Sequence, residues 1–232
     1  MNFKSFLAAG AAAFVTILAW ASPALARDQG TTLSLGVDYQ TMTIKNALSG
    51  DVKISGPRID LAADHDLIVF DRVILGAGIF AGVPTGSATQ FDTFDYCAAS
   101  DPLCLTTVTG TTTRSITVPV EFGADLHLGY QLADTVSLVA KAGVQCALVS
   151  WQESYHYPDH SYTDETYKTK EPFCGPRGAV MLGYTGLSWL DVDLEAHYAQ
   201  MAAMQSSGSY VPGSYGPSTD EVGGGVRLTL HL

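Results

Sequence analysis

Carboxylates and imidazoles recur at alternate positions in the chain, a spacing that allows acid–base or metal chemistry. The residues with this spacing are Glu121, Asp125 and His127, then Glu195 and His197, and finally His231. Side chains two positions apart in an extended segment lie on the same face, where they can exchange a proton or share a cation. Whether they meet depends on the fold that carries them.

One serine has histidines within reach in sequence. Ser150 precedes Trp151, and His156 and His160 follow in the same stretch. Nucleophilic catalysis needs a serine held against a base and a third group that orients that base. The chain has no G-x-S-x-G motif, and we therefore predict no enzymatic activity, with a lipid-modifying enzyme kept as an alternative.

The overall composition limits the classes of protein that these residues can serve. The 232 residues include 23 Asp and Glu against 12 Lys and Arg, which argues against nucleic-acid binding. The apolar share of 47% argues against a disordered acidic segment. Beyond residue 26 no apolar run is long enough for a transmembrane helix.

The first 26 residues have the three parts of a secretory signal. Lys4 supplies the positive charge, an apolar stretch runs from Phe6 to Trp20, and Ala24-Leu25-Ala26 matches the small-residue cleavage site. We predict that residues 1–26 are cleaved and that residues 27–232 form one domain outside the cytoplasm.

The exported segment alternates apolar and polar residues with the period of a β-strand. Eight such stretches lie around residues 33–39, 58–64, 73–81, 116–130, 136–148, 177–184, 190–198 and 226–232. Pro119 falls inside the longest one and cannot donate a ladder hydrogen bond, so we predict a bulge there.

The connections between these strands alternate in length. Short ones fall near 66–70, 131–134 and 185–187, and long ones near 46–55, 83–112, 152–172 and 202–218. This alternation predicts an all-β, eight-stranded antiparallel up-and-down barrel. In transmembrane barrels the short turns lie in the periplasm and the long loops outside the cell.

The apolar face can point to lipid or, in a lipocalin-like soluble barrel, to an internal ligand. Small and charged residues on the polar face suit a narrow interior that side chains fill. Tyr130 and Tyr184 lie beside short turns, and Tyr39 and Tyr198 lie near the long-loop end, as in the aromatic girdles of membrane barrels. We therefore favour the transmembrane barrel and keep the secreted ligand-binding barrel as the alternative.

Two segments and the chain end carry a family resemblance. Gly56-Pro57-Arg58-Ile59-Asp60-Leu61, the stretch Phe122–Tyr130 and the final Leu-Thr-Leu-His-Leu resemble strands of the small outer-membrane β-barrels of Gram-negative bacteria, of the opacity-protein or outer-membrane-protein-A-like type. The resemblance implies export through the periplasm to the outer membrane.

The inward face collects charges that we expect to form a network. Turn positions predict that Arg177 lies opposite Glu195 and Lys141 opposite Asp125. Arg72 would lie opposite Asp64 only if their turn were centred on Ile68. The further members of the network are Glu121, Asp193 and Arg227. Buried charges need partners, so the network predicts a plug, with a narrow ion or water channel as the alternative.

The barrel separates the histidines named above. His127 and His231 lie near the short-turn end on opposite walls, and His197 lies near the other end. In the loop, His156, Asp159 and His160 have no further ligands in view. We therefore predict no metal site and no cofactor.

The cysteines and tyrosines of the long loops point to a surface role. An even number of cysteines in an oxidising compartment predicts disulfides, which we expect between Cys97 and Cys104 and between Cys146 and Cys174. The loop between the latter two carries Tyr155, Tyr157, Tyr162 and Tyr167. Exposed tyrosines supply binding area. We predict an outer-membrane barrel, surrounded by lipid, with a structural or recognition role towards a host or cell-surface ligand.

Overall fold

The computed structural model describes residues 30–47, 50–98, 103–104, 107–159, 162–187, 189–204 and 218–232. The strands are β1 (Thr31–Ala47), β2 (Gly50–Phe70), β3 (Val73–Pro84), β4 (Ser87–Cys97), β5 (Thr107–Ala133), β6 (Val136–His156), β7 (Glu165–Leu187), β8 (Leu190–Ala203) and β9 (Ser218–His231). The described part of the chain has no helix with the length and apolar character of a membrane span. The predicted signal peptide lies outside the described residues.

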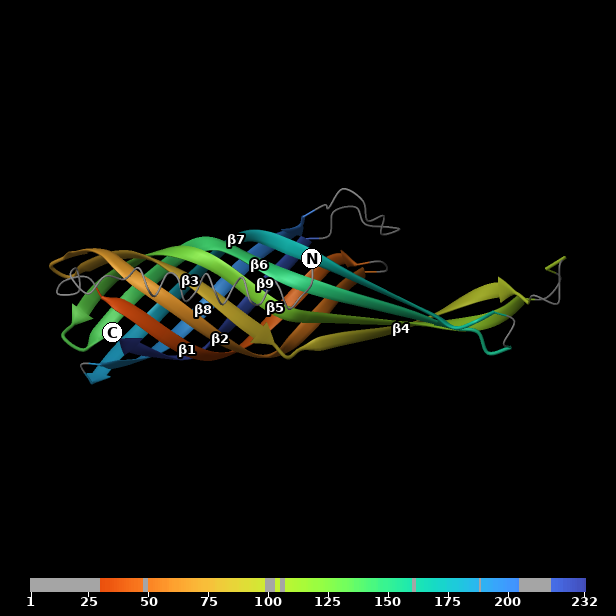
Figure 1. The fold of residues 1–232 in the computed structure, drawn as a ribbon, viewed down its shortest axis with the longest axis horizontal. Coiled ribbons are helices and arrows are strands. Elements are labelled where there is room, and N and C mark those ends of the chain that lie inside the picture. Colours follow the sequence, from red (N-terminus) through yellow and green to blue (C-terminus); the bar gives the residue numbers. More distant parts are fainter. Residues whose placement is uncertain are drawn as a thin grey trace.

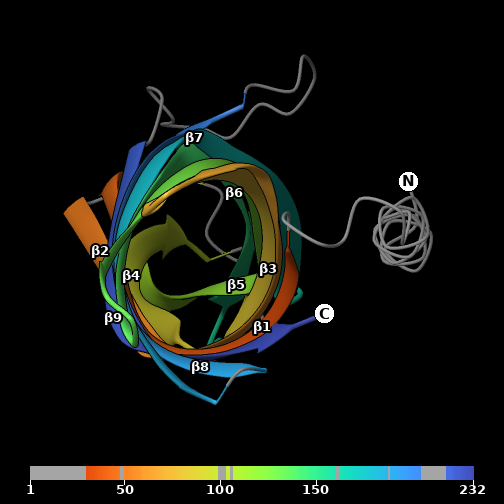
Figure 2. The ribbon, with the colours of Figure 1, turned by 90° about the vertical axis from the view of Figure 1, so that its left-hand side faces the viewer.

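Eight of the strands close into a ring. The sheet order is β3-β2-β1-β9-β8-β7-β6-β5-β4, and an additional pairing of β3 with β5 closes the barrel. All pairings are antiparallel, and the end-on view shows the ring (Figure 2). This confirms the predicted eight-stranded up-and-down barrel, whose predicted strands all fall within ring strands.

The ninth strand, β4, lies in an extension that reaches far beyond the ring (Figure 1). We call this extension the arm; it consists of β4, Thr107–Thr117 of β5, and the parts of β6 and β7 that continue its sheet. β4 pairs with Thr107–Thr117 of β5, and this part of β5 pairs in turn with β6, which pairs with β7. The connections 83–112 and 152–172, which we predicted as loops, are thus largely strand. The expected long connection 46–55 is also mostly strand, because β1 ends at residue 47 and β2 begins at residue 50.

Two local features set the strand registers. The ladder between β5 and β6 shifts between Thr117 and Val120, which confirms the bulge predicted at Pro119. The connection predicted at 66–70 lies later, because β2 continues to Phe70 and the turn is Asp71-Arg72. Asp71 has a φ of 53°, a left-handed conformation that Asp tolerates better than most residues.

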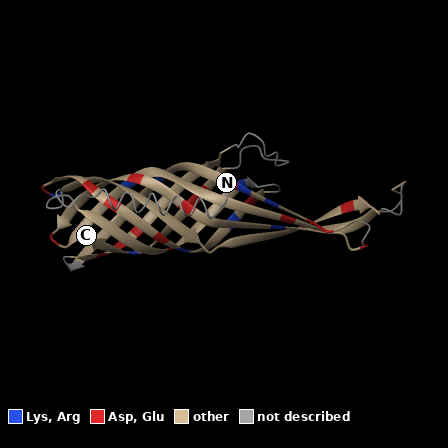
Figure 3. Ribbon diagram, in the orientation of Figure 1, with Lys and Arg blue, Asp and Glu red and all other residues tan. Residues whose placement is uncertain are grey.

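The outer surface of the ring carries a continuous apolar belt. Tyr39, Tyr130, Tyr184 and Tyr198 all point outwards and are exposed. Further exposed apolar side chains are Leu35, Val37, Ile59, Leu61, Leu126, Leu128, Val144, Val180, Leu182, Leu194, Val226 and Leu228. On the same strands the intervening residues are buried inside the ring and include many charged groups. Figure 3 shows where the charged residues lie along the strands. An apolar exterior around a polar interior is the pattern of a barrel in lipid.

The pattern inverts towards the arm end of the ring. On β1 beyond Tyr39, Thr41 and Thr43 point outwards while Met42 and Ile44 are almost fully buried. These inward residues belong to an apolar cluster inside the ring: Met42, Ile44, Val52, Ile54, Ile116, Val118, Ala147, Val149, Phe173, Ala199 and Met201. The apolar core and polar exterior of this end suit water, so the barrel continues beyond the lipid belt as a water-soluble structure.

Candidate functional site: a filled barrel and an aromatic arm

Arg58 is the centre of the charged network inside the ring. Its side chain is fully buried, and its guanidinium lies 3.0 Å from Glu121, 2.8 Å from Asp38 and 3.7 Å from Glu221. These partners come from β1, β5 and β9. A single cation on β2 therefore ties three other strands together across the barrel interior.

Two buried glutamines complete this layer. Gln40 donates to Glu121 at 2.7 Å, and Gln145 donates to Glu221 at 2.9 Å. Since both carboxylates are fully buried, these amide hydrogen bonds and Arg58 replace the water that the carboxylates lose.

Two further arginines link the acids closer to the short-turn end. Arg177 pairs with Glu195 and lies 3.5 Å from Asp125. Arg227 lies 2.6 Å from both Asp60 and Glu195. Thr229 on β9 donates a hydrogen bond to Asp193 on β8. The described interior is thus crossed by ion pairs and hydrogen bonds between distant strands.

The strand registers differ from those predicted from the turn positions. Arg177 lies opposite Ala199 rather than Glu195, although the long guanidinium still reaches Glu195 diagonally. Lys141 lies opposite His127, and its ammonium group bonds both oxygens of Asp64, at 2.8 and 2.9 Å. Arg72 is a turn residue and does not face Asp64. Each error has the same cause, since the strands turn later than the sequence suggested.

Buried side chains occupy the described interior of the ring in two layers. In the charged layer Arg58 has no exposed surface. On the arm side of this layer, Phe173 and Ile44 are completely or almost completely buried within the apolar cluster. An eight-stranded ring is only wide enough for side chains to fill.

The arm carries a cluster of aromatic rings on one face. Its members are Phe94, Tyr96, Tyr155, Tyr157, Tyr162 and Tyr167. Ring centroids of neighbours lie between 5.1 and 6.0 Å apart, mostly in edge-to-face geometry, a favourable arrangement for aromatic pairs. The four tyrosines singled out from the sequence are brought together here. Phe94 and Tyr96 were missed, although their alternate spacing within a threonine-rich stretch is a strand signal.

Acidic groups surround this aromatic face. Arg114 lies 2.7 Å from Glu153 and also pairs with Asp92. The Tyr96 hydroxyl donates a hydrogen bond to Asp159. Desolvation and this hydrogen bond raise the pKa of Tyr96 to about 12, because both favour the neutral phenol. The face combines carboxylates with tyrosine rings, of which Tyr162 and Tyr167 are exposed and Tyr96, Tyr155 and Tyr157 are half-buried.

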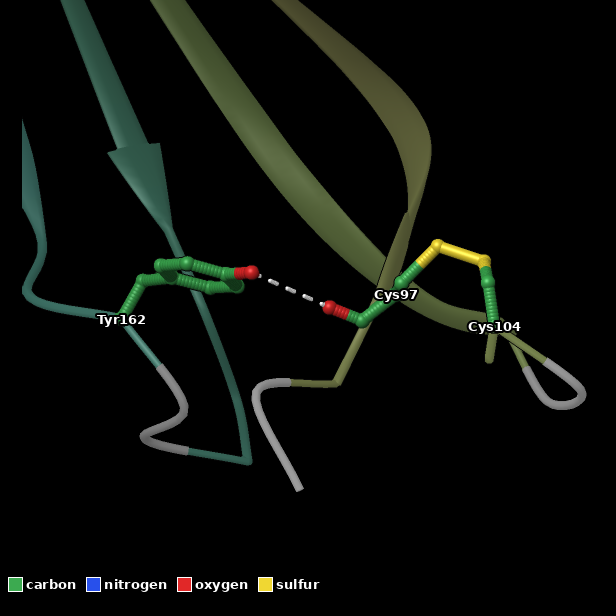
Figure 4. Close-up of a disulfide and its surroundings, with 3 residues drawn as sticks. All are labelled: Cys97, Cys104 and Tyr162. Atoms are coloured by element: carbon green, nitrogen blue, oxygen red, sulfur yellow. Dashed lines mark hydrogen bonds between the residues drawn. A yellow bond between two sulfur atoms is a disulfide. The ribbon is translucent and has the colours of Figure 1, made fainter. Parts of the chain in front are cut away.

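Two disulfides brace the structure. Cys97 is bonded to Cys104 next to the aromatic cluster, where the Tyr162 hydroxyl donates to the Cys97 carbonyl at 3.4 Å (Figure 4). Cys146 is bonded to Cys174 directly across the β6–β7 pair. Both pairings agree with those expected from the sequence. Cys146–Cys174 joins two strands that lead into the arm, whereas Cys97–Cys104 lies at the end of β4 within the arm.

The candidate catalytic serine and its base are not brought together. Ser150 and His156 lie on the same strand, β6, and six extended residues separate them by about 20 Å. His156 bonds Asp164 at 2.8 Å, and His160 lies outside the described residues.

The ring, its lipid-facing belt and its filled interior define a transmembrane β-barrel of the outer-membrane type. No family model matches the chain, and no curated protein matches it. Solved structures with a similar arrangement include Ail, the attachment invasion locus protein of Yersinia pestis, at 11% identity and a TM-score of 0.39, covering 86% of this chain and 99% of Ail.

Two further similar structures have other roles or none stated. The outer membrane protease OmpT from Escherichia coli has 13% identity and a TM-score of 0.43, over 89% of this chain and 97% of OmpT. A major outer membrane protein from Thermus thermophilus has 15% identity and a TM-score of 0.40, over 85% of this chain and 99% of that protein. At these identities the likeness concerns the fold alone.

Proposed function

We propose that the protein is a cell-surface recognition protein, in which the barrel is a closed membrane anchor and the arm is the binding element. In this proposal residues 1–26 direct export and are removed, and the barrel inserts into outer-membrane lipid. The observation that carries the proposal is the position of the aromatic cluster. It lies at the end of the molecule that extends beyond the lipid belt.

The barrel interior supports this assignment by its filled state. A charged layer and an apolar layer lie one above the other inside the ring. Opening a path would break several buried ion pairs and expose the apolar cluster, so transport through the ring is the less favoured function.

The chemistry of the arm favours a cationic partner. Tyrosine faces attract ammonium and guanidinium groups at about 0.5–2 kcal/mol per contact. Glu153, Glu165, Asp92 and Asp159 border the cluster, and the whole chain has a net charge of −11. We infer that the arm binds Arg- or Lys-rich polypeptide segments on a host or cell surface and repels polyanions.

The experiment compares binding of an arginine-rich peptide, a glutamate-rich peptide and heparin to the full chain in lipid vesicles. Fluorescence anisotropy should show binding of the arginine-rich peptide alone, weakening as salt rises. Tyr157→Ala should weaken this binding at least fivefold. Phe91→Ala is the matched control, because Phe91 is an exposed aromatic residue on the opposite face of the arm.

Three outcomes would contradict the proposal. They are no binding by the wild type, preferential binding of heparin, and equal losses in Tyr157→Ala and Phe91→Ala. Heat-modifiable gel migration of each variant shows that its barrel is folded, so a loss of binding is assigned to the arm.

A further inference from the structure

A compact group of metal-type ligands lies inside the ring, far from the arm. It comprises Asp64, Asp125 and His127, which each offer one ligand atom, and these atoms lie within 4.8 Å of one another. Asp125 and His127 are more than nine-tenths buried. The group plays no part in the proposed recognition function, and the sequence had predicted no metal site.

Two glycines allow these side chains to meet. Asp64 is on β2, and Asp125 and His127 are on β5, with β3 between them. On β3, Gly76 pairs with His127, and Gly78 pairs with both Asp64 and Asp125. A Cβ at Gly78 would lie 2.0 Å from Asp64 Oδ1, and one at Gly76 would lie 2.3 Å from His127 Nε2. Side chains from β2 and β5 therefore lie over β3 because it has none at these positions.

Two buried atoms of this group are left without a hydrogen-bond partner among the described residues. His127 Nε2 lies 3.1 Å from Asp66 Oδ1, so this nitrogen carries the proton and donates it to the carboxylate. His127 Nδ1 lies 3.6 Å from Asp64 Oδ1. Within the part of the chain that the structure describes, neither Nδ1 nor the buried Asp125 Oδ1 has a hydrogen-bond partner. Lys141 bonds both oxygens of Asp64 but donates to neither of these two atoms, so a metal ion bound at this place would find both available as ligands.

The residues that contact these ligand side chains are of the types found around known metal sites. A ligating histidine commonly donates its second ring nitrogen to a carboxylate, which fixes the ring and raises its basicity; Asp66 has this position. The other oxygen of Asp125, Oδ2, lies 3.5 Å from Arg177. Tetrahedral zinc holds its ligands about 3.4 Å from one another, close to the Asp64–His127 separation.

We propose that Asp64, Asp125 and His127 bind a divalent transition-metal ion, with Zn²⁺ as the probe, and that water completes its coordination. Imidazole with carboxylates suits such ions. Lys141 bonds Asp64 and remains there as a neighbour that lowers the affinity by charge repulsion. The ion joins β2 to β5 across β3, at the seam where the ring closes.

The test uses the full chain in detergent, stripped with a chelator and titrated with Zn²⁺ by calorimetry. We expect one ion per chain, abolition of binding by His127→Ala, and about 10–100-fold weaker binding by Asp66→Asn. Gly78→Ala should also weaken binding, because its Cβ would displace Asp64. Co²⁺ in place of Zn²⁺ should give a visible absorption spectrum that His127→Ala lacks.

Two histidine variants serve as controls. His231→Ala removes a second histidine–carboxylate pair of the ring, 2.8 Å from Asp191, and His156→Ala removes the histidine of the arm. Both should bind Zn²⁺ like the wild type. The proposal fails if the wild type shows no saturable binding, if His127→Ala and Asp66→Asn both retain full affinity, or if His156→Ala abolishes binding.

Discussion

Replacing Arg58 by methionine tests how the charged layer stabilises the barrel. The guanidinium lies within 3.0 Å of both Asp38 and Glu121 and has no exposed surface. Removing one partner of a buried ion pair leaves an uncompensated charge and typically costs about 3–5 kcal/mol. Because two carboxylates lose their partner, we expect the upper part of that range. Reversible urea unfolding in lipid vesicles, followed by tryptophan fluorescence, measures the loss.

The matched control is Arg114→Met on the arm. Arg114 also pairs with two carboxylates, Asp92 and Glu153, but all three side chains are partly exposed. Solvent screening limits such pairs to about 0–1 kcal/mol. The double variant Arg58→Met with Glu121→Gln should recover part of the lost free energy of unfolding, because it also removes one carboxylate that Arg58→Met leaves without its partner. A cost below about 1 kcal/mol for Arg58→Met would refute the assignment of Arg58 as the centre of the network.

Three further outcomes follow from the packing. Phe173→Ala should lower the free energy of unfolding by about 3–5 kcal/mol in the same urea assay, because the ring is fully buried in the apolar cluster; a loss under 1 kcal/mol would contradict that cluster. Tyr96 should ionise near pH 12 in an absorbance titration at high pH, and Asp159→Asn should lower this pKa because the hydrogen bond is lost; an unchanged titration would count against the contact. The double substitution Cys146→Ser and Cys174→Ser should lower the free energy of unfolding by roughly 3.5 kcal/mol, according to the loop-entropy relation for a sequence separation of 28. An unchanged urea midpoint would argue against a stabilising role for this disulfide.

The strands of the ring were predictable because each has one face in lipid and one in a filled interior. Apolar and polar residues therefore alternate along each strand, as Leu33, Leu35 and Val37 alternate with Ser34 and Asp38 on β1. The bulge at Pro119 was predictable for an equally local reason, the missing amide hydrogen. Neither prediction depends on which strand is the neighbour.

The ion pairs were less predictable because they depend on register and on side-chain reach. Moving the centre of a turn by one residue shifts every cross-strand pair by two, as it did for Lys141. Long side chains also reach partners on strands that are not their neighbours. Lys141 on β6, for example, bonds Asp64 on β2. The meeting of Asp64 with His127 was hidden for the same reason, since it depends on Gly76 and Gly78 of a third strand.

The strands of the arm were not predicted because their apolar and polar residues alternate with the opposite orientation from that in the lipid-facing belt. Within the belt the outward residues are apolar, but on β5 the outward residues Thr109, Thr111 and Thr113 are hydroxylic, and the aromatic rings follow the face that continues the barrel interior. A reading that seeks an apolar face towards lipid assigns such a segment to a loop. The same inversion begins inside the ring at Met42 and Ile44, where the solvent outside changes from lipid to water. The face that must be apolar therefore changes sides along a single strand, and the point of change on β1, just beyond Tyr39, marks the membrane boundary.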